Sequence, residues 1–329
     1  MPANEPSSNT SASSELGWLA DLSGLNTHSV IEVSGADSLA FLQGQLSCDL
    51  RQLSDQQTLI GAHCTPKGRM ISSFVISQDH DGETLLLRVR QDMASVALTA
   101  LKKYAVFSKV TLAQSDWQVL ALDVATLEKL GEAAPPANGF THPNADTVCI
   151  ESAGRLELWS RPTQADVYRH RCAELNISLW KASQVEAHWI ALGLAEVRQA
   201  TSEEFLPQMF NFDAIRGISY RKGCYTGQEI IARTHHKGQT KKRLYRVVCQ
   251  REPASQDGHA MLTVGSALFG DEHRAKTVAV VVALADTLTG EHDVDLLAVA
   301  NDSVVGSEAL WSPAGALSTK WIPLPYDAL

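Results

Sequence analysis

The chain has 329 residues, of which 44% are hydrophobic and 20% charged, and its net charge is −9. This length suits about two or three domains with buried cores, and the composition is typical of a globular protein. No apolar run approaches the roughly 18 residues that a membrane span requires. We therefore expect a protein without a membrane-spanning segment.

The cysteines and the amino terminus indicate the compartment. Six cysteines are present, and no two of them form a CxxC pair: Cys48, Cys64, Cys149, Cys172, Cys224 and Cys249. This spacing argues against a disulfide framework and a standard zinc site, so we expect no metal site and a cytoplasmic location. Residues 1–15 lack the basic start and apolar core of a signal peptide and are predicted to form a disordered tail.

The first half of the chain predicts strands and helices in mixed order. The expected elements are a strand at 30–33, a helix across 39–46, a hairpin of strands at 59–63 and 70–76, a strand at 85–89, a helix from Asp92 to about Phe107, and strands at 110 and 118–124. The proline-rich residues 131–146 are predicted to be a loop or a connection. A strand at 156–159 and a helix at 163–175 follow.

The order of these elements favours an α+β fold over a doubly wound parallel sheet. After Leu244 the helical period ends, and short strands at 244–249, 275–285, 296–300 and 303–305 predict a small barrel or sandwich. We place the domain boundary near residues 238–242. The expected organisation is a tail at 1–15, an α+β region at 16–238 and a β-barrel at 239–329.

One basic segment stands out in this acidic chain. Residues 216–246 contain nine lysines and arginines against one acid, Glu229, a local net charge of +8. Such asymmetry attracts a polyanion or a polycarboxylate ligand, although a solvated basic surface explains the composition equally well.

Within this segment, residues 221–229 read RKGCYTGQE. Neighbouring cations favour the thiolate form of a cysteine, and Gly223 and Gly227 allow close backbone approach or positive φ. Cys224 is therefore the leading candidate for a functional thiol, against the alternative of a buried structural cysteine. Lys222 is a candidate for activating this thiol or for holding a carboxylate.

Several ordered segments resemble one family. They are VSGADSLAFLQGQLSCDL, GAHCTPKGRM, LKKYAVFSKV, FLPQMFNFDAIRGISYRKGCYTGQEIIAR and the terminal PLPY. Together they resemble the YgfZ family of folate-binding proteins, which are associated with tRNA modification and iron–sulfur enzyme maturation and are related to the glycine cleavage aminomethyltransferase. The resemblance covers the chain from about Val30 to its end.

The resemblance implies an aminomethyltransferase-like fold, with two interlocked α+β subdomains around a central channel and a C-terminal β-barrel. It also implies tetrahydrofolate or a derivative as the ligand in that channel. Trp189 matches a position where the family places an aromatic residue against folate, with core packing as the alternative. His28 stands where a second tryptophan is expected, and Tyr225 and Arg233 are further candidates for stacking and for binding a carboxylate or phosphate.

One departure separates this chain from the aminomethyltransferase. Where that enzyme carries paired catalytic aspartates, this sequence has Ser72 and Ser73. A serine hydroxyl supplies neither negative charge nor a base at neutral pH. Methylene transfer from an aminomethyl carrier is therefore not expected.

Two functions remain open from the sequence. The first is a folate-dependent maintenance factor for iron–sulfur enzymes such as tRNA-thiolating enzymes, which affects tRNA indirectly. In this first function, Cys224 acts as a nucleophile, a transient ligand of an iron–sulfur cluster or a redox-sensitive thiol. The second is a folate-dependent one-carbon transferase acting directly on tRNA or another acceptor, and a folate carrier without chemistry of its own is a third possibility.

Overall fold

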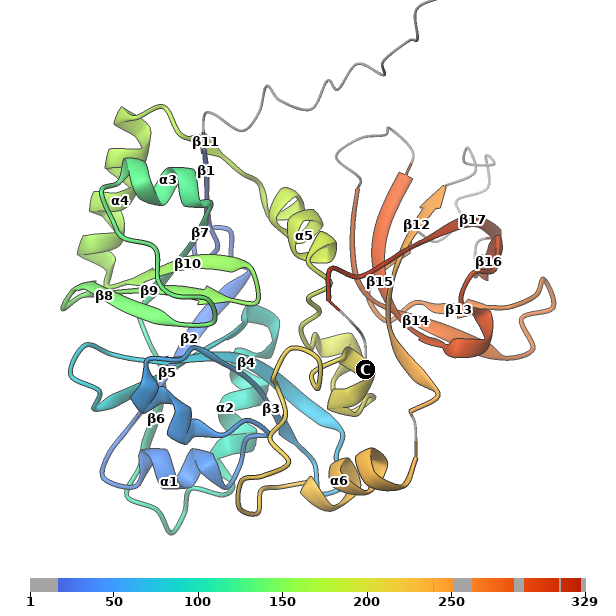
Figure 1. Ribbon diagram of the computed structural model, residues 1–329, viewed down its shortest axis with the longest axis horizontal. Coiled ribbons are helices and arrows are strands. Elements are labelled where there is room, and N and C mark those ends of the chain that lie inside the picture. Colours follow the sequence, from blue (N-terminus) through green and yellow to red (C-terminus); the bar gives the residue numbers. More distant parts are fainter. Residues whose placement is uncertain (1–16, 239, 251–261, 287–292, 314, 327–329) are drawn as a thin grey trace, which may run out of the picture.

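The computed structural model describes residues 17–238, 240–250, 262–286, 293–313 and 315–326. The tail predicted at residues 1–15 lies outside these ranges. The described chain forms two mixed α+β units, each built on one open sheet, and a closed barrel beside them (Figure 1). The predicted α+β class with a C-terminal β-barrel is confirmed.

The first unit contains a five-stranded sheet in the order β3-β4-β5-β2-β6. Its strands are β2 (His28–Ser34), β3 (Leu59–Cys64), β4 (Met70–Gln78), β5 (Thr84–Arg90) and β6 (Thr111–Gln114). Its helices are α1 (Ser38–Gln43) and α2 (Ala94–Lys102), with short 3-10 turns at Leu50–Asp55 and Gln91–Met93. The predicted hairpin is confirmed, because β3 and β4 pair antiparallel.

The second unit contains a six-stranded sheet in the order β11-β1-β7-β10-β9-β8. Its strands are β1 (Trp18–Asp21), β7 (Gln118–Leu122), β8 (Phe140–Asn144), β9 (Thr147–Ser152), β10 (Arg155–Ser160) and β11 (Ser178–Leu179). Its helices are α3 (Val124–Lys129), α4 (Pro162–Glu174) and α5 (Ala182–Ala191). The chain enters this sheet through β1 before it builds the whole first sheet, so the two units are interlocked.

Short 3-10 turns at Gln199–Thr201 and Pro207–Phe210 and helix α6 (Gln228–Lys237) lead to the barrel. Its strands close in the order β12-β15-β14-β13-β16-β17. They are β12 (Lys242–Gln250), β13 (Ala267–Phe269), β14 (Thr277–Asp286), β15 (Asp293–Asn301), β16 (Ala309–Ser312) and β17 (Gly315–Ile322). Because Val280 and Leu297 belong to the same buried apolar cluster as residues of both open sheets, the barrel is packed onto the α+β units.

Three local predictions are wrong. Helix α2 ends at Lys102, before Phe107, because short turn hydrogen bonds from Tyr104 and Ala105 redirect the chain toward β6. The predicted loop at 131–146 contains β8, whose pairing with β9 is interrupted between Thr141 and Asn144, and Pro143 lies at that irregularity. Residues 303–305 do not form a strand, since a 3-10 turn occupies Asp302–Val304.

None of the described helices is both long enough and apolar enough to cross a membrane.

Candidate functional site

The RKGCYTGQE segment forms a surface loop that leads into α6. Cys224 is exposed on it, whereas the other five cysteines are buried. Gly227 precedes α6 with φ of +85°, and a Cβ there would collide with the carbonyl oxygen of Thr65 in the β3–β4 turn. The loop is therefore held against the hairpin turn while its thiol is presented to solvent.

Lys222 points away from solvent. Its Nζ donates hydrogen bonds to the carbonyl oxygens of Leu46 (2.8 Å) and Cys48 (2.7 Å) and lies 5.1 Å from the centre of the Tyr225 ring. Burial lowers the pKa of Lys222 to about 8, and burial also raises the pKa of the Cys48 thiol to about 12. Lys222 thus anchors the loop to the segment after α1. Tyr225, in the same loop, also has a buried side chain.

The basic segment is only partly a surface. Arg243 pairs with Asp213 at 3.0 Å and Arg246 with Asp295 at 2.6 Å. The exposed cations of the segment among the described residues are Arg216, Arg221, Arg233 and Lys241. The charge that the sequence concentrates here is therefore divided between partly buried ion pairs and solvent.

Trp189 and His28 are brought together in the interior. Trp189, on α5, is 3% exposed, and its ring centre lies 5.1 Å from that of His28 on β2. The guanidinium groups of Arg155 and Arg88 lie 5.1 and 5.4 Å from the centre of the Trp189 ring. The indole is thus surrounded by protein side chains in this structure.

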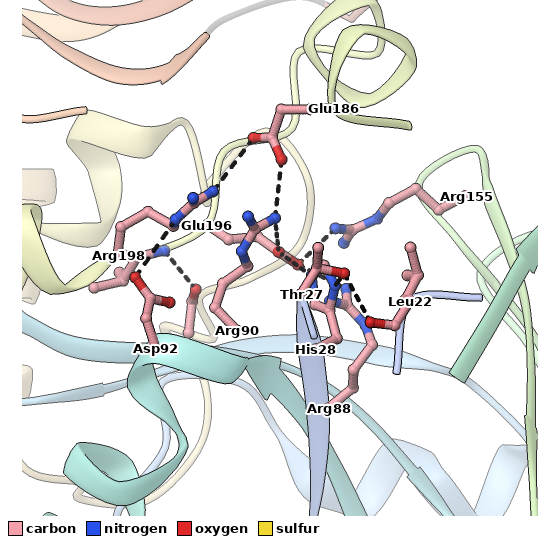
Figure 2. A network of polar contacts seen from close by, with 12 residues as sticks. Leu22, Thr27, His28, Arg88, Arg90, Asp92, Arg155, Glu186, Glu196 and Arg198 are labelled. Atoms are coloured by element: carbon pink, nitrogen blue, oxygen red, sulfur yellow. Dashed lines mark hydrogen bonds and ion pairs between the residues drawn. The ribbon is translucent and has the colours of Figure 1, made fainter. Parts of the chain in front are cut away.

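These residues border a buried ionic network centred on Glu196 (Figure 2). Glu196 accepts hydrogen bonds from Arg88 at 2.7 Å, from Arg155 at 2.8 Å and from His28 at 2.9 Å. Burial acts to raise the pKa of Glu196, but Arg88, His28 and Arg155 outweigh it and hold that pKa well below its usual range. Arg90 extends the network through a hydrogen bond of 3.0 Å to Glu186, as Figure 2 shows.

His28 is neutral in this setting. Burial lowers its pKa well below 6.5, and the neighbouring Arg88 acts in the same direction. Its Nε2 therefore carries the hydrogen that Glu196 accepts, because a carboxylate only accepts. The imidazole links β2 to the segment after α5.

Of the two positions of the absent aspartates, Ser73 lies next to this network. Ser72 is fully buried, and its hydroxyl has no hydrogen-bond partner among the described residues. The Ser73 hydroxyl accepts a hydrogen bond of 2.9 Å from the backbone of Val197. A cavity of about 10 Å³ beside Ser73 and Glu196 has room for one water molecule at most, so no larger ligand fits there.

A much larger cavity of about 600 Å³ lies between α5 and strands β12, β15 and β17, beside the contact of α5 with β14. On the α5 side it is lined by the small side chains of Ala187 and Ala191. Its other lining residues are His188, Arg246, Val248, Gln250, Asp293, Asp295, Ser318, Thr319, Lys320 and Ile322. The barrel wall therefore carries cations and carboxylates on neighbouring strands.

An aromatic cluster adjoins this cavity through His188. The rings of Trp18 and Trp180 are stacked, with centres 4.0 Å apart and planes 6° apart. His188 meets both rings edge-on, at 5.6 and 6.0 Å. The cavity thus has charged side chains on the barrel and an aromatic group at α5, the combination that orients small polar ligands.

The cavity lining and the buried network were missed by the sequence reasoning. Arg88 and Arg90 alternate with leucine and valine in β5, a pattern of a strand with one solvated face, but both arginines are buried. Two arginines on one face of a strand, with Glu186 and Glu196 farther along the chain, could have suggested an ion network. Nothing in the sequence pairs Ala187 and Ala191 with the barrel.

A search of family models finds no match to this chain. The structure is similar to glycine cleavage system aminomethyltransferase T from Bartonella henselae, with a TM-score of 0.71 and 14% sequence identity over 94% of this chain and 86% of that chain. The chain therefore has an aminomethyltransferase-like fold. At this identity the likeness defines the fold alone.

Proposed function

We propose that this protein is a folate-binding protein of the YgfZ type that supports tRNA modification by maintaining iron–sulfur enzymes. The observation that carries the proposal is the exposure of Cys224 on an anchored loop while every other cysteine is buried. The aminomethyltransferase-like fold and the motif around Cys224 support the same assignment.

The cavity beside α5 is the proposed folate site. Its volume of about 600 Å³ falls within the roughly 300–1,000 Å³ of small-molecule sites. Folate combines a flat pterin with a glutamate tail, and Lys320 offers an ammonium for a carboxylate while Asp293 accepts from an amino group. In this arrangement Trp189, on α5, packs against His28, and this contact holds α5 beside the cavity. Arg233, exposed on α6, is a separate candidate for binding an anion.

Cys224 supplies the proposed chemistry. A single thiolate provides one ligand to an iron–sulfur cluster, so a cluster at Cys224 takes its other ligands from the client enzyme or from another molecule. The same exposed thiol is suited to transient nucleophilic or redox exchange with a client. In this proposal the partners are folate and iron–sulfur enzymes, and tRNA is affected through them.

Direct action on tRNA is the second candidate. It is favoured by the exposed cations Arg216, Arg221 and Arg233 near the thiol in sequence. RNA binding through phosphates weakens steeply with salt. A salt-independent or undetectable affinity for tRNA excludes this candidate and leaves the protein-partner role.

Calorimetry with tetrahydrofolate tests the ligand site. We expect wild type to bind, Ala191→Leu to bind at least tenfold more weakly because the added side chain fills the cavity, and Lys320→Ala to lose several-fold affinity. Ala173→Leu, on an exposed position of α4, is the matched control and retains wild-type affinity. Unchanged affinity in Ala191→Leu would place folate elsewhere, and no binding by wild type would remove the folate assignment.

The thiol is tested separately in cells that lack the protein. Wild type is expected to restore thiolated tRNA nucleosides, measured by mass spectrometry, and Cys224→Ala to fail while still binding tetrahydrofolate. Full restoration by Cys224→Ala would mean that the thiol has no part in the function. Cys249→Ala, in the barrel, controls for loss of a cysteine as such.

A further inference from the structure

An apolar patch is exposed on the loop between α2 and β6. Phe107 is 99% exposed and Val106 is 73% exposed. Tyr104, at the start of the loop, and Leu39, on α1, are each 44% exposed. Isolated exposed apolar residues are common, but a group of this kind marks an interaction surface.

The loop has a defined conformation. Ser108 and Val110 make backbone turn hydrogen bonds of 2.9 Å within it. Its end is attached to α1, because the backbone N–H of Lys109 donates to the Asp37 carboxylate at 2.7 Å. Gly35 has φ of +112°, and a Cβ there would collide with the carbonyl oxygen of Lys109. Phe107 is thus presented by a fixed loop, which lowers the entropy cost of binding a partner.

Three lysines flank the exposed apolar residues of the loop in the sequence. Lys102, Lys103 and Lys109 are all exposed, and none forms an ion pair with another described residue. The nearby Asp37 carboxylate already accepts the backbone hydrogen bond of Lys109. In a chain whose net charge is −9, this is a local basic surface suited to an acidic partner.

Helix α1 connects this surface to the loop of Cys224. It begins after Asp37, and at its other end the carbonyl oxygen of Gly44 accepts a hydrogen bond of 3.2 Å from the backbone of Thr226. Six helical residues span about 9 Å. Figure 1 shows α1 and α6 at the same end of the molecule. The apolar patch and the exposed thiol therefore lie near the two ends of one short helix.

We propose that Phe107, Val106, Tyr104 and Leu39, with Lys102, Lys103 and Lys109, form the docking surface for a client protein that has an acidic rim around an apolar pocket. Phe107 enters the pocket as the anchor, and the lysines pair with the rim. Docking here places the client beside Cys224, so the inference rests on the proposed role of that thiol. Phe107 and Tyr104 have rings on which a base could stack, but Val106 and Leu39 are aliphatic, so a protein with an apolar pocket is favoured over single-stranded RNA.

Site-specific photo-crosslinking of the full chain in cells tests this surface. A photoreactive phenylalanine analogue is placed at position 107, and at Leu179 as a control that is 76% exposed on β11. We expect one discrete protein adduct at 107, whose crosslinked peptide, identified by mass spectrometry, is acidic and apolar, and no such adduct at 179. Lys102→Glu with Lys103→Glu is expected to reduce the yield roughly tenfold.

The outcomes separate this proposal from the proposed function. The adduct at position 107 is expected to persist in Cys224→Ala. If that variant loses tRNA thiolation but keeps the adduct, the thiol acts in a step other than docking. An adduct with RNA, an adduct with a second copy of the chain, equal yields at 107 and 179, or no adduct would each overturn the docking surface. Urea unfolding of Phe107→Ser is expected to equal that of wild type, because Phe107 is 99% exposed, which verifies that the loop variant is folded.

Discussion

The Nζ atom of Lys222 donates a hydrogen bond of 2.7 Å to the carbonyl oxygen of Cys48. This contact joins the loop of Cys224 to the segment that follows α1, and it directs the ammonium inward. The lysine of the motif is therefore a structural anchor in this arrangement, and the thiol two residues later is the group that reaches solvent.

Replacing Lys222 with methionine should destabilise the protein. The change removes two charge-assisted hydrogen bonds and leaves the carbonyls of Leu46 and Cys48 without this donor, so we expect a loss of about 2–3 kcal/mol. Urea unfolding measures it. Arg221→Met, at the exposed neighbouring position, should change stability by less than about 0.5 kcal/mol. Equal effects of the two substitutions would contradict the anchoring role.

The stability contribution of Lys222 should rise with pH. Burial lowers its pKa to about 8, whereas an unfolded lysine has a pKa of about 10.4. Between these values the unfolded chain binds more protons than the folded protein, so raising the pH favours folding through this group. The difference in unfolding free energy between wild type and Lys222→Met should be larger at pH 9.5 than at pH 7.5. A difference that shrinks would show that the folded pKa is not lowered.

Thiol labelling should distinguish Cys224 from the other cysteines. Burial raises the pKa of the Cys149 and Cys249 thiols to about 12, and Cys48 and Cys64 are shifted in the same direction. With iodoacetamide at pH 8, the native protein should incorporate one label, at Cys224, and the denatured protein six. Peptide mass spectrometry locates the label. Rapid native labelling of any buried cysteine would refute this assignment.

Removing the charge of Glu196 should have a large effect. Glu196→Gln leaves Arg88 and Arg155 without a shared carboxylate in the interior, and we expect a loss of about 3–5 kcal/mol in urea unfolding. Glu83→Gln, on the exposed β4–β5 turn, is the control. A loss below about 1 kcal/mol would mean that the network contributes little to folding.

The same carboxylate should make the protein sensitive to acid. Because Arg88, His28 and Arg155 hold the pKa of Glu196 below its unfolded value, its contribution is complete above about pH 4.3 and is lost as the pH falls further. The stability gap between wild type and Glu196→Gln should therefore narrow between pH 5 and pH 3. A constant gap over this interval would exclude a lowered pKa.

Local sequence patterns were sufficient to predict most elements and the class of fold. Two apolar runs separated by Pro66 and Gly68 identified the β3–β4 hairpin, and the loss of helical period after Leu244 identified the barrel, because such runs and turn residues act within a few positions. The motif around Cys224 also stood out locally, since glycines and basic residues there depart from the rest of the chain. These features need no knowledge of distant contacts.

Which side chains meet, and where they point, depends on packing between distant parts of the chain. Lys222 turns toward Leu46 and Cys48, which precede it by more than 170 residues, and Arg88 is buried because Glu196 and Glu157 come from other elements. Phe107 is exposed because α2 ends at Lys102. The cavity depends on small residues of α5 facing a barrel built later in the chain. Burial and charge pairing are set by long-range packing, and sequence periodicity carries no record of which distant surface covers a given side chain.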